Sequence, residues 1–193
     1  KRLRATLKNY EDITFGVYNS STQQKDADGI SEYGRIFKDE MGKPLQPLKN
    51  EIISRDTMQK KPPHILVTNY AMLEYMLLRP NDDKVFSGAK LRFLVLDEAH
   101  IYRGATGIEM SLLLRRLKAR ISDPSKVLHI LTSATLGGKE ANADIVTFAS
   151  RLCETEFSEN DIIRSTTQSS VLPDEEYDIS MELFAELAEP EDS

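Results

Sequence analysis

Short apolar runs alternate with segments of helical periodicity along most of the chain. Three runs, at residues 65–68, 91–96 and 129–132, are almost entirely apolar. Runs of this kind are typical of strands that are covered on both faces, as in a parallel sheet. A fourth run, residues 13–18, is rich in β-branched and aromatic side chains and also predicts a strand. The pattern therefore predicts strands separated by helical segments.

Helical spacing of apolar residues predicts most of the intervening segments. Asn69 is a candidate N-cap for a helix at residues 70–78, which ends before Pro80. Further helices are predicted at residues 1–10, 48–60, 110–121 and 140–152. The polar stretch 19–46 is predicted to be a long loop or a local insertion. This alternation predicts an α/β fold, a three-layer sandwich with a mostly parallel sheet and right-handed crossovers.

Charge divides the chain into two parts. The net charge is −6, but residues 1–139 contain 23 Lys and Arg against 16 Asp and Glu, a net of +7. Residues 140–193 contain 2 against 15, a net of −13. We therefore expect a domain at residues 1–153 that can face a polyanion. An acidic linker or lid, with a short helix at residues 180–188, is expected at residues 154–193.

Composition excludes several classes of protein. With 40% hydrophobic and 29% charged residues, the chain is typical of a globular domain, and no window approaches the roughly 18 apolar residues of a membrane span. The basic start is not followed by an apolar run, so no secretion signal is predicted. Cys153 is the only cysteine, which excludes an internal disulfide and a thiolate zinc cluster. A reducing compartment, the cytoplasm, is expected.

The first candidate for chemistry is the tetrapeptide Asp97-Glu98-Ala99-His100, directly after the run 91–96. Ligands of open parallel sheets bind beyond the carboxyl ends of the strands. Two carboxylates at such a position suit Mg²⁺, which prefers oxygen ligands, and a carboxylate beside the ion can activate a water molecule. An isolated carboxylate pair is nevertheless more often a charged surface turn.

Two further polar segments change this assessment. The run 129–132 leads into Ser133-Ala134-Thr135, and the run 65–68 leads into Asn69 through Thr68. Parallel strands would gather all three polar ends at one edge of a sheet. Three such segments in this order are much less frequent by chance than any one of them alone.

Together these segments resemble the first RecA-like domain of superfamily 2 helicases of the DEAH/DExH type. Residues 94–100, Leu-Val-Leu-Asp-Glu-Ala-His, resemble motif II, and residues 131–135, Leu-Thr-Ser-Ala-Thr, resemble motif III. Residues 65–73 resemble motif Ib. The segment Tyr102-Arg103-Gly104 and the helix after it are similar to the large bacterial DNA helicases of the Lhr-like and MrfA/Hrq1-like group. The resemblance covers residues 1–165 and implies an incomplete RecA-like (P-loop NTPase) domain.

The resemblance implies a role for each residue of motifs II and III. Asp97 would hold the Mg²⁺ of Mg-ATP through its water shell. Glu98 would orient and activate the water that attacks the γ-phosphate, a reaction in which positioning and charge neutralisation supply most of the acceleration. His100 would link this site to Ser133-Ala134-Thr135 and so couple the nucleotide state to movement of the strand.

The resemblance also implies a nucleic-acid partner. Thr68 and Asn69 would bind a phosphate of the tracked strand, a task suited to a capped helix N-terminus. Arg103 is either a contact to nucleic acid or to another domain, or part of a structural ion pair. DNA is expected rather than RNA, because the segment 102–104 resembles the DNA-acting group. A second RecA-like domain of the same parent protein is the expected protein partner.

One essential part of such a motor is missing from the sequence. No Gly-x-x-x-x-Gly-Lys-Ser/Thr motif occurs, and Gly138-Lys139 is followed by Glu140 and has Ser133 five positions before its glycine. Without the loop that cradles the phosphates, nucleotide affinity should be poor. We expect an excised piece of a helicase, which needs ATP and Mg²⁺ in the parent protein but is inactive by itself.

Two alternatives remain open at the level of sequence. One is a non-catalytic nucleic-acid-binding module that retains the fold, which predicts salt-dependent binding without an effect of ATP. The other is a metal-dependent hydrolase that uses Asp97, Glu98 and His100 as ligands. This second alternative predicts a stably bound divalent ion in the absence of nucleotide.

Overall fold

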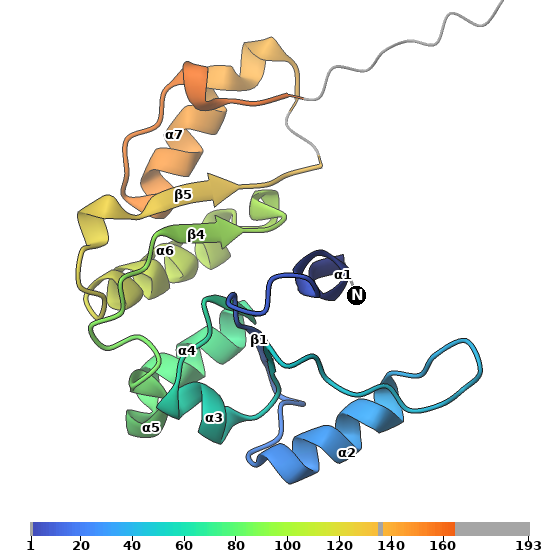
Figure 1. Ribbon diagram of the computed structural model, residues 1–193. Helices are drawn as coiled ribbons and strands as arrows, with labels where there is room; N and C mark the ends of the chain where they lie inside the picture. The colour runs from blue at the N-terminus through green and yellow to red at the C-terminus, as the bar shows by residue number, and fades with distance from the viewer. Residues whose placement is uncertain (1, 135–136, 165–193) are drawn as a thin grey trace, which may run out of the picture. The chain divides into compact units, whose positions relative to one another are not determined.

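The computed structural model describes residues 2–134 and 137–164. Figure 1 shows the arrangement of the helices and strands. The strands are β1 (Phe15–Tyr18), β2 (Glu51–Ile52), β3 (Ile65–Thr68), β4 (Phe93–Leu96) and β5 (Leu128–Leu131). The α-helices are α1 (Arg2–Leu7), α2 (Asp26–Ile36), α3 (Arg55–Lys60), α4 (Tyr70–Leu78), α5 (Pro80–Asp83), α6 (Gly104–Lys118) and α7 (Asn142–Cys153).

The strands form two parallel sheets. In the first sheet β1 lies between β2 and β3, and in the second β4 pairs with β5, with Leu96 opposite Leu131. The predicted α/β class with parallel sheets is confirmed. The three polar segments that follow β3, β4 and β5 do not share one sheet. Strand β3 pairs with β1 in the first sheet, whereas β4 and β5 form the second. Only the ends of β4 and β5 are joined directly by strand pairing.

One face of the β4–β5 pair is exposed. The alternate residues Phe93, Val95, Leu128 and Ile130 are 45–60% exposed, whereas Leu96 is 7% exposed. Side chains alternate between the two faces of a strand, so these four residues lie on the same face. The apolar runs predict that both faces of these strands are covered. In the part of the chain that the structure describes, only one face of the β4–β5 pair is covered.

Helices α4 and α6 supply much of the core. Each presents one row of buried side chains at helical spacing: Met72, Leu73, Met76 and Leu77 on α4, and Met110, Leu113, Leu114 and Leu117 on α6. The two helices contact each other, and their rows belong to one hydrophobic cluster with Tyr18 of β1 and Leu96 of β4. This single core connects the two sheets.

The stretch 19–46 contains helix α2, where a loop or insertion is expected from the sequence. Its two glycines lower the helix propensity, which explains why the pattern does not predict it. Tertiary contacts stabilise it: Asp26 accepts hydrogen bonds from the hydroxyls of Ser54 at 2.5 Å and Thr57 at 2.9 Å. A side chain at Gly29 would meet Ile53 at 3.2 Å, so the glycine allows close packing of the helix.

The helix predicted at residues 48–60 begins only at Arg55, with Ser54 as its N-cap. Glu51 and Ile52 form β2 instead, because they pair with β1. Long-range strand pairing thus overrides the local helical spacing in the first half of this segment.

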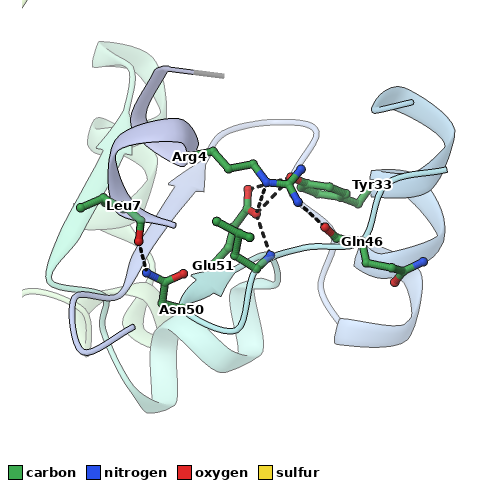
Figure 2. Close-up of polar contacts among 7 residues, drawn as sticks. Arg4, Leu7, Tyr33, Gln46, Asn50 and Glu51 are labelled. Carbon is green, nitrogen blue, oxygen red and sulfur yellow. Dashed lines mark hydrogen bonds and ion pairs between the residues drawn. The ribbon is translucent and has the colours of Figure 1, made fainter. Parts of the chain in front are cut away.

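A polar network joins α1, α2 and the chain leading into β2, as Figure 2 shows. The Arg4 guanidinium lies 5.4 Å from the centroid of the Tyr33 ring and 3.7 Å from the Glu51 carboxylate, and it donates to the Gln46 carbonyl at 2.5 Å. The Tyr33 hydroxyl donates to Glu51 at 3.0 Å. Burial, reinforced by the Glu51 charge, raises the pKa of Tyr33 to about 12. The network fixes the N-terminal helix to the first sheet.

The compact unit extends to Asp161, and the domain boundary at residue 153 stays a prediction. Phe157 is half-buried and packs against the core, and Cys153 is buried as a free thiol. Most of the acidic segment and the helix predicted at 180–188 lie outside the described residues. Within residues 2–134 and 137–164, no helix is long and apolar enough to cross a membrane.

Candidate functional site

The acidic pair lies at the carboxyl end of β4, at an abrupt change of backbone direction. Leu96 is buried, whereas Asp97 and Glu98 are exposed. Glu98 adopts the left-handed conformation, with φ 50° and ψ 45°, and precedes a short 3₁₀ helix over Ala99–Ile101. A non-glycine residue in this region is uncommon and costs on the order of 1 kcal/mol or more, so the surroundings must hold it there.

The end of β5 provides these surroundings. The Thr132 hydroxyl lies 2.5 Å from Asp97 Oδ1 and 3.1 Å from the Glu98 backbone nitrogen. The Thr132 backbone N–H donates to the Leu96 carbonyl at 2.9 Å, and the Thr132 carbonyl accepts from the Ala99 N–H at 2.8 Å. The acidic turn and the segment after β5 therefore form one hydrogen-bonded unit.

His100 connects the acidic pair with the same segment. Its Nδ1 lies 3.1 Å from Glu98 Oε2 and 3.2 Å from Ser133 Oγ, and the Ala134 N–H donates to Glu98 Oε2 at 3.4 Å. A carboxylate can only accept, so Nδ1 must carry a proton for its contact with Glu98 to be a hydrogen bond. The structure thus brings Asp97, Glu98 and His100 together with Ser133 and Ala134. Thr135, the last residue of this predicted group, lies outside the described residues.

The acidic pair suits a hydrated divalent ion that is bound mainly by the phosphates of a nucleotide substrate. Asp97 is exposed, and only its Oδ1 accepts from Thr132, which leaves Oδ2 to face a water of such an ion. Among the described residues, no three His, Cys, Asp or Glu side chains converge as metal ligands. Mg²⁺ keeps several waters and is typically bound through one or two carboxylates and substrate phosphates. A hydrolase with Asp97, Glu98 and His100 as three metal ligands is not supported.

Thr68 and Asn69 lie at the end of β3 and the start of α4. Asn69 Oδ1 accepts from the Met72 N–H at 2.9 Å, so the predicted N-cap is confirmed. The Thr68 hydroxyl donates its only proton to the Tyr18 carbonyl at 2.7 Å. The groups that remain able to donate to an anion are the Asn69 side-chain amide and the N–H groups of Tyr70 and Ala71, which lack intrahelical partners at the start of α4.

Arg103 immediately precedes α6 and is exposed. In the described part of the chain its guanidinium has no ion pair or hydrogen bond, so a structural ion pair is not found there. Its neighbour Gly104 has φ 57°, which suits glycine at this sharp entry to the helix.

Sequence reasoning did not identify Thr132 as a member of the site. Thr132 stands within the quoted motif III string, but its side-chain direction depends on the pairing of β4 with β5, which the sequence pattern does not specify. The only available signal in the sequence is its place as the polar last residue of the apolar run 129–132.

A small polar cavity of about 260 Å³ lies beside Tyr18 at the carboxyl end of β1. Asp82, 2% exposed, accepts a hydrogen bond from the Tyr18 hydroxyl and another from Gln59 at 2.6 Å. The Arg55 guanidinium lies 5.4 Å from the centroid of the Tyr18 ring. Burial, followed by the bond to Asp82, raises the pKa of Tyr18 to about 12. Arg55 donates to the Asn19 carbonyl at 3.0 Å, and its Nε is buried without a hydrogen-bond partner in the described part of the chain. Because Tyr18 and Gln59 both bond to Asp82, we interpret the cavity as structural.

Comparisons with known proteins agree with the resemblance to helicases. The model of the DEAD/DEAH box helicase family matches residues 20–143. The Druantia protein DruE of Escherichia coli (strain UMEA 4076-1) is 42% identical over 134 residues, which are 64% of this chain and 7% of DruE. The ATP-dependent helicase Lhr-Core of Methanocaldococcus jannaschii is 34% identical over 85 residues, 40% of this chain and 10% of that protein. The expected similarity to Lhr-like helicases is confirmed.

Among solved structures, the DUF1998 helicase MrfA bound to DNA matches 78% of this chain and 21% of that chain, with 20% identity and a TM-score of 0.40. The chain therefore spans only a small part of the relatives it matches. Its described fold is that of an incomplete RecA-like α/β domain.

Proposed function

The chain belongs to the DEAD/DEAH box helicase family, and we propose from this that its parent protein couples ATP hydrolysis to movement along a nucleic-acid strand. The chain would contribute motif II, motif III and motif Ib to that motor. The observation that carries the proposal is the hydrogen-bonded unit between the acidic turn at Asp97 and Glu98 and the segment Thr132–Ala134.

In this proposal each acidic residue has a separate task. Asp97, whose side chain is exposed, would hold the hydrated Mg²⁺ that accompanies ATP. The ion supplies neutralisation of the phosphate charge when it is bound. Glu98, half-exposed and left-handed, would accept a hydrogen bond from the attacking water and take up its proton.

His100 would link the hydrolysis site to the segment after β5. Its Nδ1 is within hydrogen-bonding distance of both Glu98 and Ser133, so a shift of the Glu98 carboxylate during the reaction changes a contact of Ser133. Ala134 is linked to the same carboxylate through its backbone N–H. Thr135 completes the proposed coupling segment by its place in the motif.

The start of α4 is the proposed contact to the nucleic-acid strand. The Asn69 amide and the free N–H groups of the first helical turn are suited to one backbone phosphate. Thr68 would act mainly by fixing this turn to β1, since its proton is donated to the Tyr18 carbonyl. Arg103 is a further candidate because its exposed guanidinium is not engaged in the described part of the chain. DNA is proposed over RNA on the resemblance of Tyr102-Arg103-Gly104 to the DNA-acting helicases.

The isolated chain is proposed to be inactive. Its 193 residues contain no Gly-x-x-x-x-Gly-Lys-Ser/Thr motif, the loop whose backbone N–H groups and lysine cradle the phosphates. A second RecA-like domain is the proposed intramolecular partner in the parent protein. The parent is proposed to act in the cytoplasm, because the single cysteine, Cys153, is a free thiol and thiols persist in a reducing compartment.

The test compares ATP hydrolysis by the complete protein and by the 193-residue chain, with single-stranded DNA present. Glu98→Gln in the complete protein should lower kcat by about 10²–10⁴-fold, the usual contribution of a general base. Glu40→Gln, at an exposed position between α2 and β2, is the control and should leave kcat unchanged. The chain alone should show no turnover. Turnover by the chain that Glu98→Gln abolishes would refute the proposed inactivity.

A non-catalytic nucleic-acid-binding module is the second candidate, favoured by the missing phosphate loop. It predicts that the chain binds single-stranded DNA with a strong dependence on salt and without any effect of Mg-ATP. The same complete protein would then hydrolyse no ATP. ATP hydrolysis that depends on Glu98 excludes this candidate for the parent protein.

A further inference from the structure

Thr132 makes four hydrogen bonds to four consecutive residues of the acidic turn. Its backbone N–H and carbonyl bond to Leu96 and Ala99, and its hydroxyl bonds to Asp97 and to the Glu98 backbone nitrogen. Parallel pairing of β4 with β5 accounts for the register of the backbone contacts. It does not require a hydroxyl on this side chain, which leaves the two side-chain bonds to be explained.

The direction of both side-chain bonds follows from the chemistry of the partners. The Glu98 backbone N–H can only donate, so the Thr132 oxygen accepts from it. An ionised Asp97 carboxylate can only accept, so the single Thr132 hydroxyl proton is directed to Asp97 Oδ1. The resulting chain runs from the Glu98 N–H through the Thr132 hydroxyl to the Asp97 carboxylate. One hydroxyl thus orients the backbone of one acidic residue and the side chain of the other.

This chain also explains the left-handed conformation of Glu98. The residue is held on its amino side by the bond from its own N–H to the Thr132 hydroxyl, and on its carboxyl side by the bond from Ala99 to the Thr132 carbonyl. Unusual backbone conformations persist where the surroundings determine them from more than one side. At Glu98 the conformation sets the direction from which the side chain leaves the turn.

We infer that Thr132 is a positioning residue for the hydrolysis reaction: its hydroxyl sets the relative orientation of the Asp97 and Glu98 carboxylates. The inference rests on the proposed function and adds to it a positioning role for Thr132, the residue directly before Ser133-Ala134-Thr135. Thr132 does not touch the reacting atoms. Its effect is exerted through Asp97 Oδ1 and through the backbone of Glu98.

The test uses two substitutions at this position in the complete protein. Thr132→Val keeps the shape and removes the hydroxyl, whereas Thr132→Ser keeps the hydroxyl. Thr132→Val should lower kcat for ATP on the order of 100-fold, the effect of a small misplacement of reacting groups, with KM changed less than about twofold. Thr132→Ser should restore most of kcat. Thr147→Val, the same substitution at an exposed position on α7, should have no effect.

A second measurement uses the 193-residue chain and does not depend on activity. Amide hydrogen exchange followed by NMR should show the Glu98 N–H protected in the wild type and in Thr132→Ser. Exchange of this amide should be faster by about tenfold in Thr132→Val, which corresponds to a lost hydrogen bond of about 1.4 kcal/mol. Amides of α4, far along the chain from the substitution, should exchange at unchanged rates.

The outcomes separate the inference from the proposed function. Glu98→Gln abolishing ATP hydrolysis while Thr132→Val retains wild-type kcat would overturn the inference alone. The inference is also overturned if kcat of a folded Thr132→Ser variant falls as far as that of Thr132→Val. It is overturned as well if Thr132→Val changes KM and leaves kcat at the wild-type value. A complete protein without Glu98-dependent hydrolysis would overturn the proposed function, and the exchange rate of the Glu98 amide would still test the hydrogen bond.

Discussion

The buried contact between Tyr18 and Asp82 shows how single residues stabilise this fold. The Tyr18 side chain is fully buried, and its hydroxyl bonds to a carboxylate that is itself 2% exposed. Tyr18→Phe removes one of the donors to Asp82 and leaves a buried acceptor less satisfied. We expect the free energy of unfolding to fall by about 1–3 kcal/mol in urea denaturation. Tyr10→Phe, at an exposed ring, is the control; equal losses in both variants would contradict this explanation.

His129 gives the stability a dependence on pH. Burial, reinforced by the Lys118 charge, lowers the pKa of His129 below its ordinary value of 6.5. The unfolded chain therefore binds a proton at this residue more readily than the folded chain, so the stabilising contribution is present above pH 6.5 and is lost as the pH falls. Tm should decrease between about pH 7 and pH 5. His129→Gln should flatten this part of the curve, and an unchanged slope would assign the effect to other groups.

At the scale of residues, the sequence predicts candidates whose chemistry and position coincide. Asp97 and Glu98 are predicted because two carboxylates follow an apolar run, and the structure places His100 in contact with Ser133, while the roles of these residues stay predictions. Thr132 is missed because the direction of its hydroxyl is decided by the register of β4 and β5, which are separated by a helix. A contact of this kind becomes visible only when the pairing is known.

At the scale of elements, substitutions of Asn69 separate the stability that its cap gives to α4 from the proposed binding of single-stranded DNA. Its Oδ1 caps α4, and its amide is the proposed donor to a phosphate. Asn69→Ala should lower the free energy of unfolding by about 1 kcal/mol and weaken binding of single-stranded DNA. Asn69→Asp keeps the cap and replaces the donor with a carboxylate, so stability should be retained while binding, measured by fluorescence anisotropy, decreases. DNA affinity equal to the wild type in Asn69→Asp would remove Asn69 from the proposed interface.

The elements that sequence predicts correctly are those with a strong internal pattern. Strands β3, β4 and β5 follow from short apolar runs, and α4 and α6 follow from rows of large apolar side chains. Helix α2 does not, because it is polar, contains two glycines and depends on contacts with the segment 53–57. The same holds for β2, a two-residue strand formed only through its pairing with β1.

At the scale of the whole molecule, charge is distributed along the chain in a way that bears on binding. All 25 Lys and Arg lie in residues 1–164, against 22 Asp and Glu, a net of +3. Residues 165–193 contain nine acidic and no basic residues, a net of −9. An acidic segment tethered to a basic domain lowers the attraction of that domain for polyanions. The net charge of the complete chain thus hides a part that is suited to nucleic acid.

This asymmetry predicts that removal of residues 165–193 strengthens binding to single-stranded DNA. The truncated chain loses nine negative charges and no positive ones, so its affinity at low salt should rise on the order of tenfold, because electrostatic attraction supplies most sequence-independent binding. Fluorescence anisotropy of a labelled oligonucleotide over a range of salt concentrations measures the difference, which should shrink as screening increases. A chain of full length in which the nine acidic residues are replaced by Asn and Gln is the matched control and should bind like the truncated chain. Equal affinity of the truncated and complete chains at low salt would show that the acidic segment does not oppose binding.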